Sequence, residues 1–117
     1  MTVLVEIPLE LRGGMNSRDA HWRARQRRVK NEREQTAWAL FGKKKPATPC
    51  LIRITRIAPS AGLDDDNLRS ACKGVRDAFA EWIGVDDRRS DVVAYDYDQL
   101  RGAWGVRIEQ IEDAHDF

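Results

Sequence analysis

The feature that most limits the fold of this chain is the order of its strand-like and helix-like patterns of apolar residues. Apolar residues at every second position are typical of strands, and apolar residues every three to four positions are typical of helices. Strand patterns occur at 2–11, 50–58, 91–98 and 103–111, and helix patterns run from Asn16 or Ser17 to about Phe41 and over 68–83. This β-α-β-α-β-β order predicts a mixed α/β protein of the α+β class, with helices packed on a small mixed sheet.

The length suits one domain, 1–117, and residues 113–117 are expected to form a frayed acidic tail. No apolar run approaches the roughly 20 residues of a membrane helix, and the N-terminus lacks the pattern of a signal peptide. We therefore expect a cytoplasmic protein with no membrane partner, in which Cys50 and Cys72 stay reduced and partly buried.

Each helix pattern has an apolar face that is expected to meet the core. In the first helix this face consists of Trp22, Val29, Ala37 and Phe41. In the second it consists of Leu68, Cys72, Val75, Phe79 and Trp82. Trp38 and Trp104 are also expected in the core, and a role in stacking on a nucleobase is the less favoured alternative for Trp22.

The formal net charge of +1 conceals two oppositely charged parts of the chain. Residues 18–45 contain ten Lys or Arg and three Asp or Glu, a balance of +7. Residues 64–117 contain seven basic and fourteen acidic residues, a balance of −7. This division fits a basic surface for a polyanion beside an acidic site for cations, and it fits two solvated faces without a ligand equally well.

Three consecutive aspartates, Asp64 to Asp66, precede the second helix, and Asp86 and Asp87 follow its end at Gly84. Carboxylates bind Mg²⁺ and leave coordination sites for a phosphate oxygen and a water. If residues 64–66 are extended, Asp64 and Asp66 point the same way and can reach one ion. The alternative is that aspartates cap the helix and interact with its dipole, each contributing up to about 1 kcal/mol.

The segment LDDDNL at 63–68, with Lys73, Asp77 and the later Val85-Asp86-Asp87, resembles the RusA family of Holliday-junction resolvases. Asn16 and His21-Trp22-Arg23 resemble phage and prophage relatives of this family, and the similarity covers about residues 3–111. The resemblance implies a Mg²⁺-dependent homodimer, in which Mn²⁺ can replace Mg²⁺, that makes paired nicks in four-way DNA junctions. It also implies that Asp64, Asp66 and Asp87 are the metal-binding, catalytic carboxylates.

The family pattern has a catalytic lysine four residues after the second aspartate of this motif, where the present chain has Ser70. Lys73 lies about one turn further along, on roughly the same face of a helix. Lys73 is therefore the candidate for a catalytic cation that stabilises the pentacovalent phosphate. Its alternative role is a surface ion pair with Asp77 or Asp66.

An unbroken helix over 68–83 would be about 24 Å long at a rise of 1.5 Å per residue. Asp66 and Asp87 would then lie near opposite ends and could not share an ion unless the chain folded back sharply. A two-fold dimer with antiparallel helices would bring Asp64 and Asp66 of one chain to Asp87 of the other. We therefore expect an intertwined homodimer with two composite active sites, which matches the roughly two-fold shape of a four-way junction.

Basic side chains along the first helix, in the loop after it and beside Asp87 are the expected contacts to branched DNA. They are Arg18, His21, Arg23, Arg25, Arg27, Arg28, Lys30, Lys43, Lys44, Lys45, Arg88 and Arg89. For the last two, the alternative role is to screen the charges of Asp86 and Asp91.

Three other functions remain open from the residues alone. A protein with this fold could bind junctions with or without metal and cut nothing, or a metal nuclease could act on flaps, RNA or plain duplex. A small interaction protein could use its acidic half to bind a basic partner, although the basic helix beside the carboxylates argues against that function.

Overall fold

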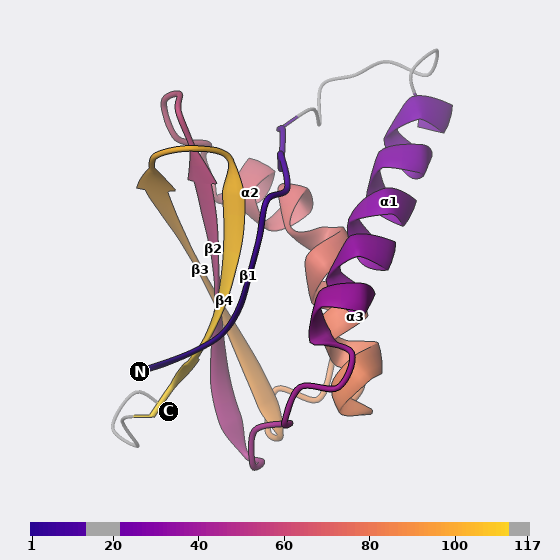
Figure 1. Ribbon diagram of the computed structural model, residues 1–117, viewed down its shortest axis with the longest axis vertical. Helices are drawn as coiled ribbons and strands as arrows, with labels where there is room; N and C mark the ends of the chain where they lie inside the picture. The colour runs from indigo at the N-terminus through magenta and orange to yellow at the C-terminus, as the bar shows by residue number, and fades with distance from the viewer. Residues whose placement is uncertain (14–21, 113–117) are drawn as a thin grey trace.

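The computed structural model describes residues 1–13 and 22–112, which form a four-stranded mixed sheet with three helices on one of its faces (Figure 1). In chain order the elements are β1 (Thr2–Ile7), α1 (Trp22–Leu40), β2 (Cys50–Ala58), α2 (Asp65–Ala71), α3 (Lys73–Ile83), β3 (Val93–Arg101) and β4 (Gly105–Ile111). The expected α+β class is confirmed, as is the mixed sheet.

The strand order is β1-β4-β2-β3, in which β2 and β3 are parallel and the other two neighbouring pairs are antiparallel. In the parallel pair, Cys50 lies opposite Val93 and Ala58 lies opposite Arg101. A parallel pair needs a long crossover connection, and α2 and α3 supply it here. The segment with the three aspartates therefore lies between the end of β2 and the start of this crossover.

The core lies between the helices and the inner face of the sheet. Ile52 and Ile54 from β2, Ile108 from β4 and Phe79 from α3 are fully buried. Leu68, Cys72 and Val75 are buried as expected, and Trp82 is partly buried with its ring centroid 5.4 Å from that of Phe79. The prediction that these residues of the second helix pattern face the core is therefore confirmed.

The second helix pattern corresponds to two helices rather than one. α2 ends at Ala71, α3 begins at Lys73, and Cys72 between them has φ −87° and ψ 1°, outside the helical region. α2 already begins at Asp65, because the side chain of Asp64 accepts a hydrogen bond from the backbone N–H of Asn67 and caps the helix. The expectations of an unbroken helix over 68–83 and of an extended segment over 64–66 are therefore wrong.

α1 packs with a different face from the one that its apolar residues predict. Its buried residues are Glu32, Thr36 and Leu40, whereas Trp38 is 76% exposed and Phe41, just after the helix, is 77% exposed. Trp22 is half exposed and Ala37 is exposed, so only Val29 of the expected apolar face is partly buried. The placement of Trp22 and Trp38 in the core is therefore wrong, while Trp104 is partly buried.

The contact between α1 and α3 explains this choice of face. A Cβ atom added at Gly74 would lie only 2.9 Å from the backbone carbonyl of Val29 and 3.1 Å from the Cβ of Glu32. The two helices therefore approach almost backbone to backbone at Gly74, where no large apolar side chain of α1 can fit. Thr36 tolerates burial because its hydroxyl donates to the backbone carbonyl of Glu32 at 2.7 Å.

A carboxyl group is buried at the same contact. Glu32 is 4% exposed, and burial raises its pKa to about 7, an effect that the charge of Arg28 opposes. Because the ordinary pKa is 4.5, the folded chain keeps this proton over a pH interval in which the unfolded chain has lost it.

We expect this carboxyl group to make the fold less stable as the pH rises from about 4.5 to about 7. The stabilisation by the bound proton is complete below the unfolded pKa and is lost as the pH passes through the folded pKa. The loss is on the order of 3 kcal/mol. Glu32→Gln should abolish it, so that the variant matches the wild type near pH 5 and is more stable near pH 8, as measured by urea unfolding. An identical pH dependence of the two proteins would contradict this expectation.

Both cysteines are free and buried, as expected. Cys50 is 1% exposed and Cys72 is 0% exposed. Burial raises the pKa of both thiols, that of Cys72 to about 12. Neither thiol is therefore ionised to an appreciable extent at neutral pH.

Among the helices of residues 1–13 and 22–112, none combines the length and the apolar character that crossing a membrane requires.

Candidate active site

One side chain fixes the segment with the three aspartates to the end of β3. The amide oxygen of Gln99 accepts from the backbone N–H of Leu63, and the amide nitrogen of Gln99 donates to the carbonyl of Leu63, both at 2.8 Å. The buried Arg56 donates to the carbonyl of Leu11 at 2.6 Å and to the amide oxygen of Gln99 at 3.4 Å. These contacts hold Asp64, the next residue after Leu63, at the edge of the sheet.

The three aspartates at the start of α2 are all exposed but have different neighbours. The carboxylate of Asp64 accepts from the backbone N–H and the side-chain amide of Asn67, at 2.9 and 3.2 Å. Asp65 and Asp66 lie in the first turn of α2, and neither side chain has a hydrogen bond or ion pair in the part of the chain that the structure describes. Asp64 thus caps the helix, which was the alternative to metal binding for these aspartates. The carboxylates of Asp65 and Asp66 are available to a cation.

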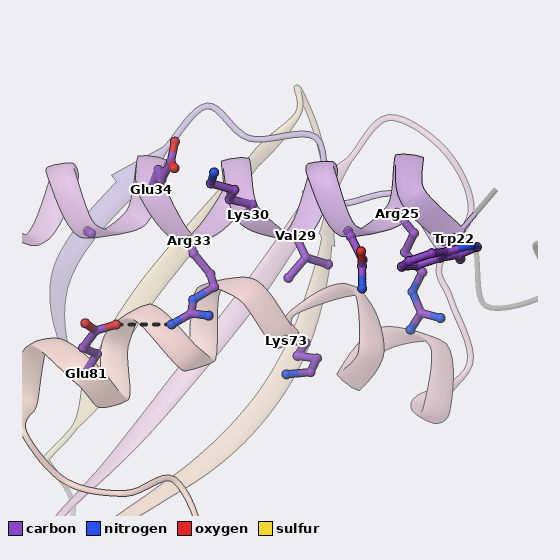
Figure 2. A pocket seen from close by; sticks show the side chains of 10 residues that line it. Trp22, Arg25, Val29, Lys30, Arg33, Glu34, Lys73 and Glu81 are labelled. Carbon is purple, nitrogen blue, oxygen red and sulfur yellow. Dashed lines mark hydrogen bonds and ion pairs between the residues drawn. The ribbon is translucent and has the colours of Figure 1, made fainter.

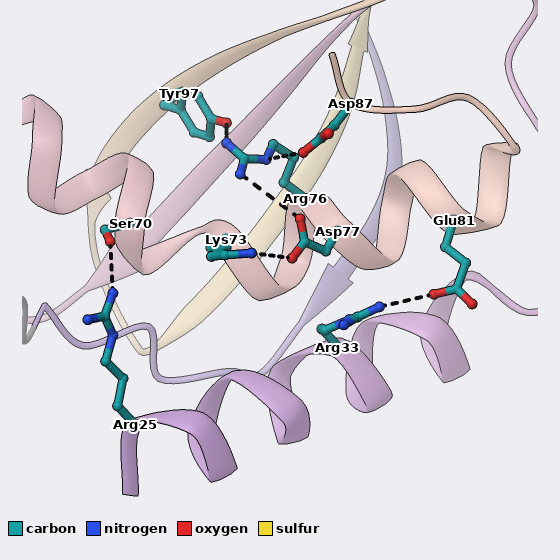
Figure 3. A network of polar contacts seen from close by, with 9 residues as sticks. All are labelled: Arg25, Arg33, Ser70, Lys73, Arg76, Asp77, Glu81, Asp87 and Tyr97. Carbon is teal, nitrogen blue, oxygen red and sulfur yellow. Dashed lines mark hydrogen bonds and ion pairs between the residues drawn. The ribbon is translucent and has the colours of Figure 1, made fainter. Parts of the chain in front are cut away.

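Asp87 does not lie beyond the far end of α3, because the loop after Gly84 folds back. Its carboxylate lies 3.2 Å from the Nε of Arg76, near the start of α3, as an ion pair without hydrogen-bond geometry (Figure 3). The guanidinium of Arg76 also donates to the hydroxyl of Tyr97 at 3.1 Å and lies 4.0 Å from Asp77. The premise that a whole helix separates Asp66 from Asp87 is therefore wrong.

Arg76 and Tyr95 are residues of this site that the sequence did not reveal. Burial lowers the pKa of Arg76, but the hydrogen bond to Tyr97 and the charges of Asp87 and Asp77 outweigh it, so the net shift is upward. The hydroxyl of Tyr95 is buried without a hydrogen-bond partner among the described residues, and burial together with the charge of Asp87 raises its pKa. Alternation along a strand places Tyr95 and Tyr97 on one face, but it gives no sign of the loop with Asp87 that lies near them.

The candidate metal ligands are not gathered into one group within a single chain. In residues 1–13 and 22–112, no three His, Cys, Asp or Glu side chains lie close enough together to hold one metal ion. The chemistry of the donors nevertheless suits Mg²⁺, which prefers carboxylate oxygens. The side chain of Asp66 has no partner among the described residues, and Arg76 pairs with one oxygen of Asp87 at 3.2 Å.

Lys73 and Ser70 lie on consecutive turns but have different partners. The ammonium of Lys73 donates to Asp77 at 2.7 Å, which is the ion pair set out as its alternative role. The hydroxyl of Ser70 accepts from the guanidinium of Arg25 in α1 at 3.4 Å (Figure 3). A cation from α1 thus lies at the position where the resemblance expects a lysine.

A groove of about 680 Å³ runs between α1 and α3 (Figure 2). The cationic residues that line it are Arg25, Lys30, Arg33 and Lys73. The acidic ones are Glu34 and Glu81, of which Glu81 forms an ion pair with Arg33 at 3.3 Å. Trp22 lies at one end of this groove, and Val29 points into it from α1. The groove therefore combines apolar surface with an excess of positive charge.

The other expected DNA contacts have varied surroundings. Exposed side chains are those of Arg23, Arg27, Lys43, Lys44 and Lys45, whereas Arg28 is partly buried. Arg88 pairs with Asp86 at 3.1 Å and Arg89 with Asp91 at 3.0 Å, which are their alternative partners. The hydrogen bonds from Arg88 lower the pKa of Asp86 to about 2. Arg18 and His21 lie outside the described residues.

Compared with models of known protein families, with curated proteins and with solved structures, the chain has no significant match in any of the three.

Proposed function

We propose that this protein is a Mg²⁺-dependent endonuclease that resolves four-way DNA junctions by paired nicks in recombination and repair, as its resemblance to the RusA family implies. The observation that carries the proposal is that α2, whose first turn is acidic, contacts the basic helix α1. The hydrogen bond from Arg25 to Ser70 joins the two helices one turn away from Asp66. A carboxylate site for a cation and a basic surface for a polyanion thus lie side by side.

A divalent cation at this site would supply Lewis acidity and an activated water for hydrolysis of the phosphodiester. Asp66, Asp64 and Asp87 are the residues that would hold it. Gln99 positions the first two through Leu63, and Arg76 fixes the orientation of Asp87. The part of the protein in catalysis is therefore to hold carboxylates and phosphate in a fixed arrangement before the reaction begins.

The DNA backbone would follow the basic side of α1. This helix has 19 residues and is about 28 Å long at 1.5 Å per residue, enough to follow several consecutive phosphates. The exposed indole of Trp22 at the end of the groove adds a surface on which an unpaired base at the junction can stack.

The proposed active form is a homodimer with composite sites, in which Asp64 and Asp66 of one chain meet Asp87 of the other. Exposed aromatic residues at the end of α1 support the dimer: Trp38 in the helix and Phe41 just after it are each more than three-quarters exposed, and their ring centroids lie 6.2 Å apart. Contiguous apolar surface of this kind marks interaction sites on soluble proteins. A second copy of the chain is the partner that a two-fold junction calls for.

The test is to incubate the protein with a synthetic four-way junction and Mg²⁺, beside a linear duplex of the same sequence. We expect paired, symmetric nicks in the junction, no cleavage of the duplex, and loss of cleavage when the metal is chelated. Equal cleavage of linear, flapped and four-way substrates would favour a metal nuclease for other nucleic acids.

A second candidate function is junction binding without cleavage. It is favoured by the ion pairs that already engage Lys73 with Asp77 and Arg76 with Asp87. A wild-type protein that binds the junction equally well with and without Mg²⁺ and never cuts it would establish this function in place of the nuclease.

A further inference from the structure

A second, much smaller cavity lies between α1, α2 and the segment after β1. The residues that line it are Arg12, Arg25, Arg28, Val29, Glu32, Ser70 and Ala71. Its volume is about 10 Å³, just enough for one water-sized atom. Three arginines thus line a space that would accommodate a single oxygen.

Positive charge dominates around this space. Glu32 is the one acidic residue among the described residues that line it, beside three arginines, and the charge of Arg28 acts on its carboxyl group. Arg12 is held in place by an ion pair with Glu10 at 2.9 Å, and its guanidinium lies 5.0 Å from the ring centre of Trp104. Arg25 is held by Ser70. Arg12 and Arg25 therefore already have partners that orient them, which reduces the entropic cost of binding an anion.

The cavity adjoins the face of α2 that bears Asp66. Asp66 and Ser70 are four residues apart in this helix and so lie on the same face, with Cβ atoms about 5–6 Å apart. The guanidinium of Arg25, at 3.4 Å from the hydroxyl of Ser70, therefore lies beside the place where Asp66 would hold a cation.

We propose that Arg25, assisted by Arg12 and Arg28, forms the subsite for the phosphate that is cleaved, with one non-bridging oxygen of that phosphate in the small cavity. This inference rests on the proposed function and identifies Arg25 as the side chain that binds the phosphate of its substrate. The planar fork of a guanidinium matches two oxygens of a phosphate, and charge-assisted hydrogen bonds of this kind are about twice as strong as neutral ones. Lys73 is then a structural partner of Asp77 rather than the phosphate ligand.

The experiment compares Arg25→Gln, Arg25→Lys and Arg107→Gln with the wild type. Arg107 is the matched control, because it is an arginine that pairs with Glu6 in the sheet and lines neither the groove nor the cavity. Binding to a four-way junction is measured in a chelator over a range of salt concentrations, and single-turnover cleavage is measured in Mg²⁺ with the protein in excess. Thermal unfolding checks that each variant is folded.

For Arg25→Gln we expect the slope of log affinity against log salt to fall in magnitude by about 1, because one phosphate contact is lost. We expect the single-turnover rate to fall about 100-fold, as for the loss of one donor to a developing oxyanion. Arg25→Lys should keep the slope and recover the rate to within about tenfold of the wild type. Arg107→Gln should leave both quantities unchanged.

Glu32→Gln, which removes the opposing carboxyl group, should strengthen binding near pH 8 by a few-fold.

These readouts separate the subsite from the proposed function. If the wild type cuts the junction while Arg25→Gln has an unchanged slope and rate, the subsite is overturned and the nuclease stands. If the wild type never cuts but Arg25→Gln lowers the slope and Arg107→Gln does not, Arg25 stands as a phosphate contact and the nuclease is overturned. If the wild type never cuts and the slope is also unchanged, both are overturned.

Discussion

Asp66→Asn is expected to reduce cleavage of a four-way junction by roughly 10³-fold while junction binding stays close to that of the wild type. A metal ion contributes several kcal/mol to the stabilisation of a hydrolytic transition state, and each 1.36 kcal/mol corresponds to a factor of ten in rate. The side chain is exposed and has no partner within the described residues, so the substitution should change the free energy of unfolding by less than about 1 kcal/mol.

The matched control is Asp65→Asn, which removes the same charge from the neighbouring position in the same helical turn. Asp65 is also exposed and also lacks a partner among the described residues, but it is not one of the proposed ligands. Cleavage by this variant should stay within a few-fold of the wild type. A similar loss in both variants would show that only the total negative charge matters, and equal cleavage by Asp66→Asn and the wild type would exclude Asp66 as a ligand.

Mixing two inactive variants is expected to restore cleavage if the active sites are shared between chains. In a mixed dimer of Asp66→Asn and Asp87→Asn, one composite site has both aspartates intact and the other has neither. Random reassortment of equal amounts makes about half of the dimers mixed, each with one working site, so roughly a quarter of the wild-type nicking rate should return. The product should be a junction with a single nick rather than the pair of duplexes that two symmetric nicks produce.

No recovery of cleavage in the mixture would contradict shared active sites. If each site is built from one chain, every site in the mixed dimer still lacks one aspartate, and activity stays at the level of the separate variants. Because Asp87 folds back onto Arg76 of its own chain, this single-chain arrangement is a real competitor. Each variant must first be shown to unfold at the temperature of the wild type and to form dimers of the same mass.

Local patterns sufficed to predict most strands but not the length of each one. The alternating segment between Pro49 and Pro59 has the same bounds as β2, because each proline interrupts the pattern. β3 extends to Arg101 although Asp98, Gln99 and Arg101 near its end are polar, since its parallel register with β2 continues to the pair Ala58 and Arg101. The length of β3 is thus set by its partner strand, and its own residues contain no sign of that limit.

The face that α1 buries could not be predicted from α1 alone. Periodicity identifies residues that share a face, but which face meets the core depends on the element packed against it. Here Gly74, far away in sequence, allows a backbone approach that buries Glu32 and Thr36 and leaves Trp38 outside. A tryptophan at helical spacing with other apolar residues was therefore misassigned to the core.

The same division between local and distant contacts applies to the candidate site. The cap by Asp64 and the ion pair between Lys73 and Asp77 were among the predicted alternatives, because both involve residues three or four apart. The contacts of Arg25 with Ser70 and of Arg76 with Asp87 join different elements. Only the packing of the three helices determines them, and no spacing in the sequence indicates either contact.

The burial of Cys50 and Cys72 makes the wild-type chain a ready background for site-directed spectroscopy. Thiol-reactive dyes and spin labels attack the thiolate, so neither native cysteine should take up a label under conditions in which an introduced surface cysteine does. A single probe at Gln35, an exposed position of α1, would then report the separation between two copies of the helix directly. Such a measurement could follow the arrangement of the chains before, during and after the arrival of a junction, without any cysteine having to be removed first.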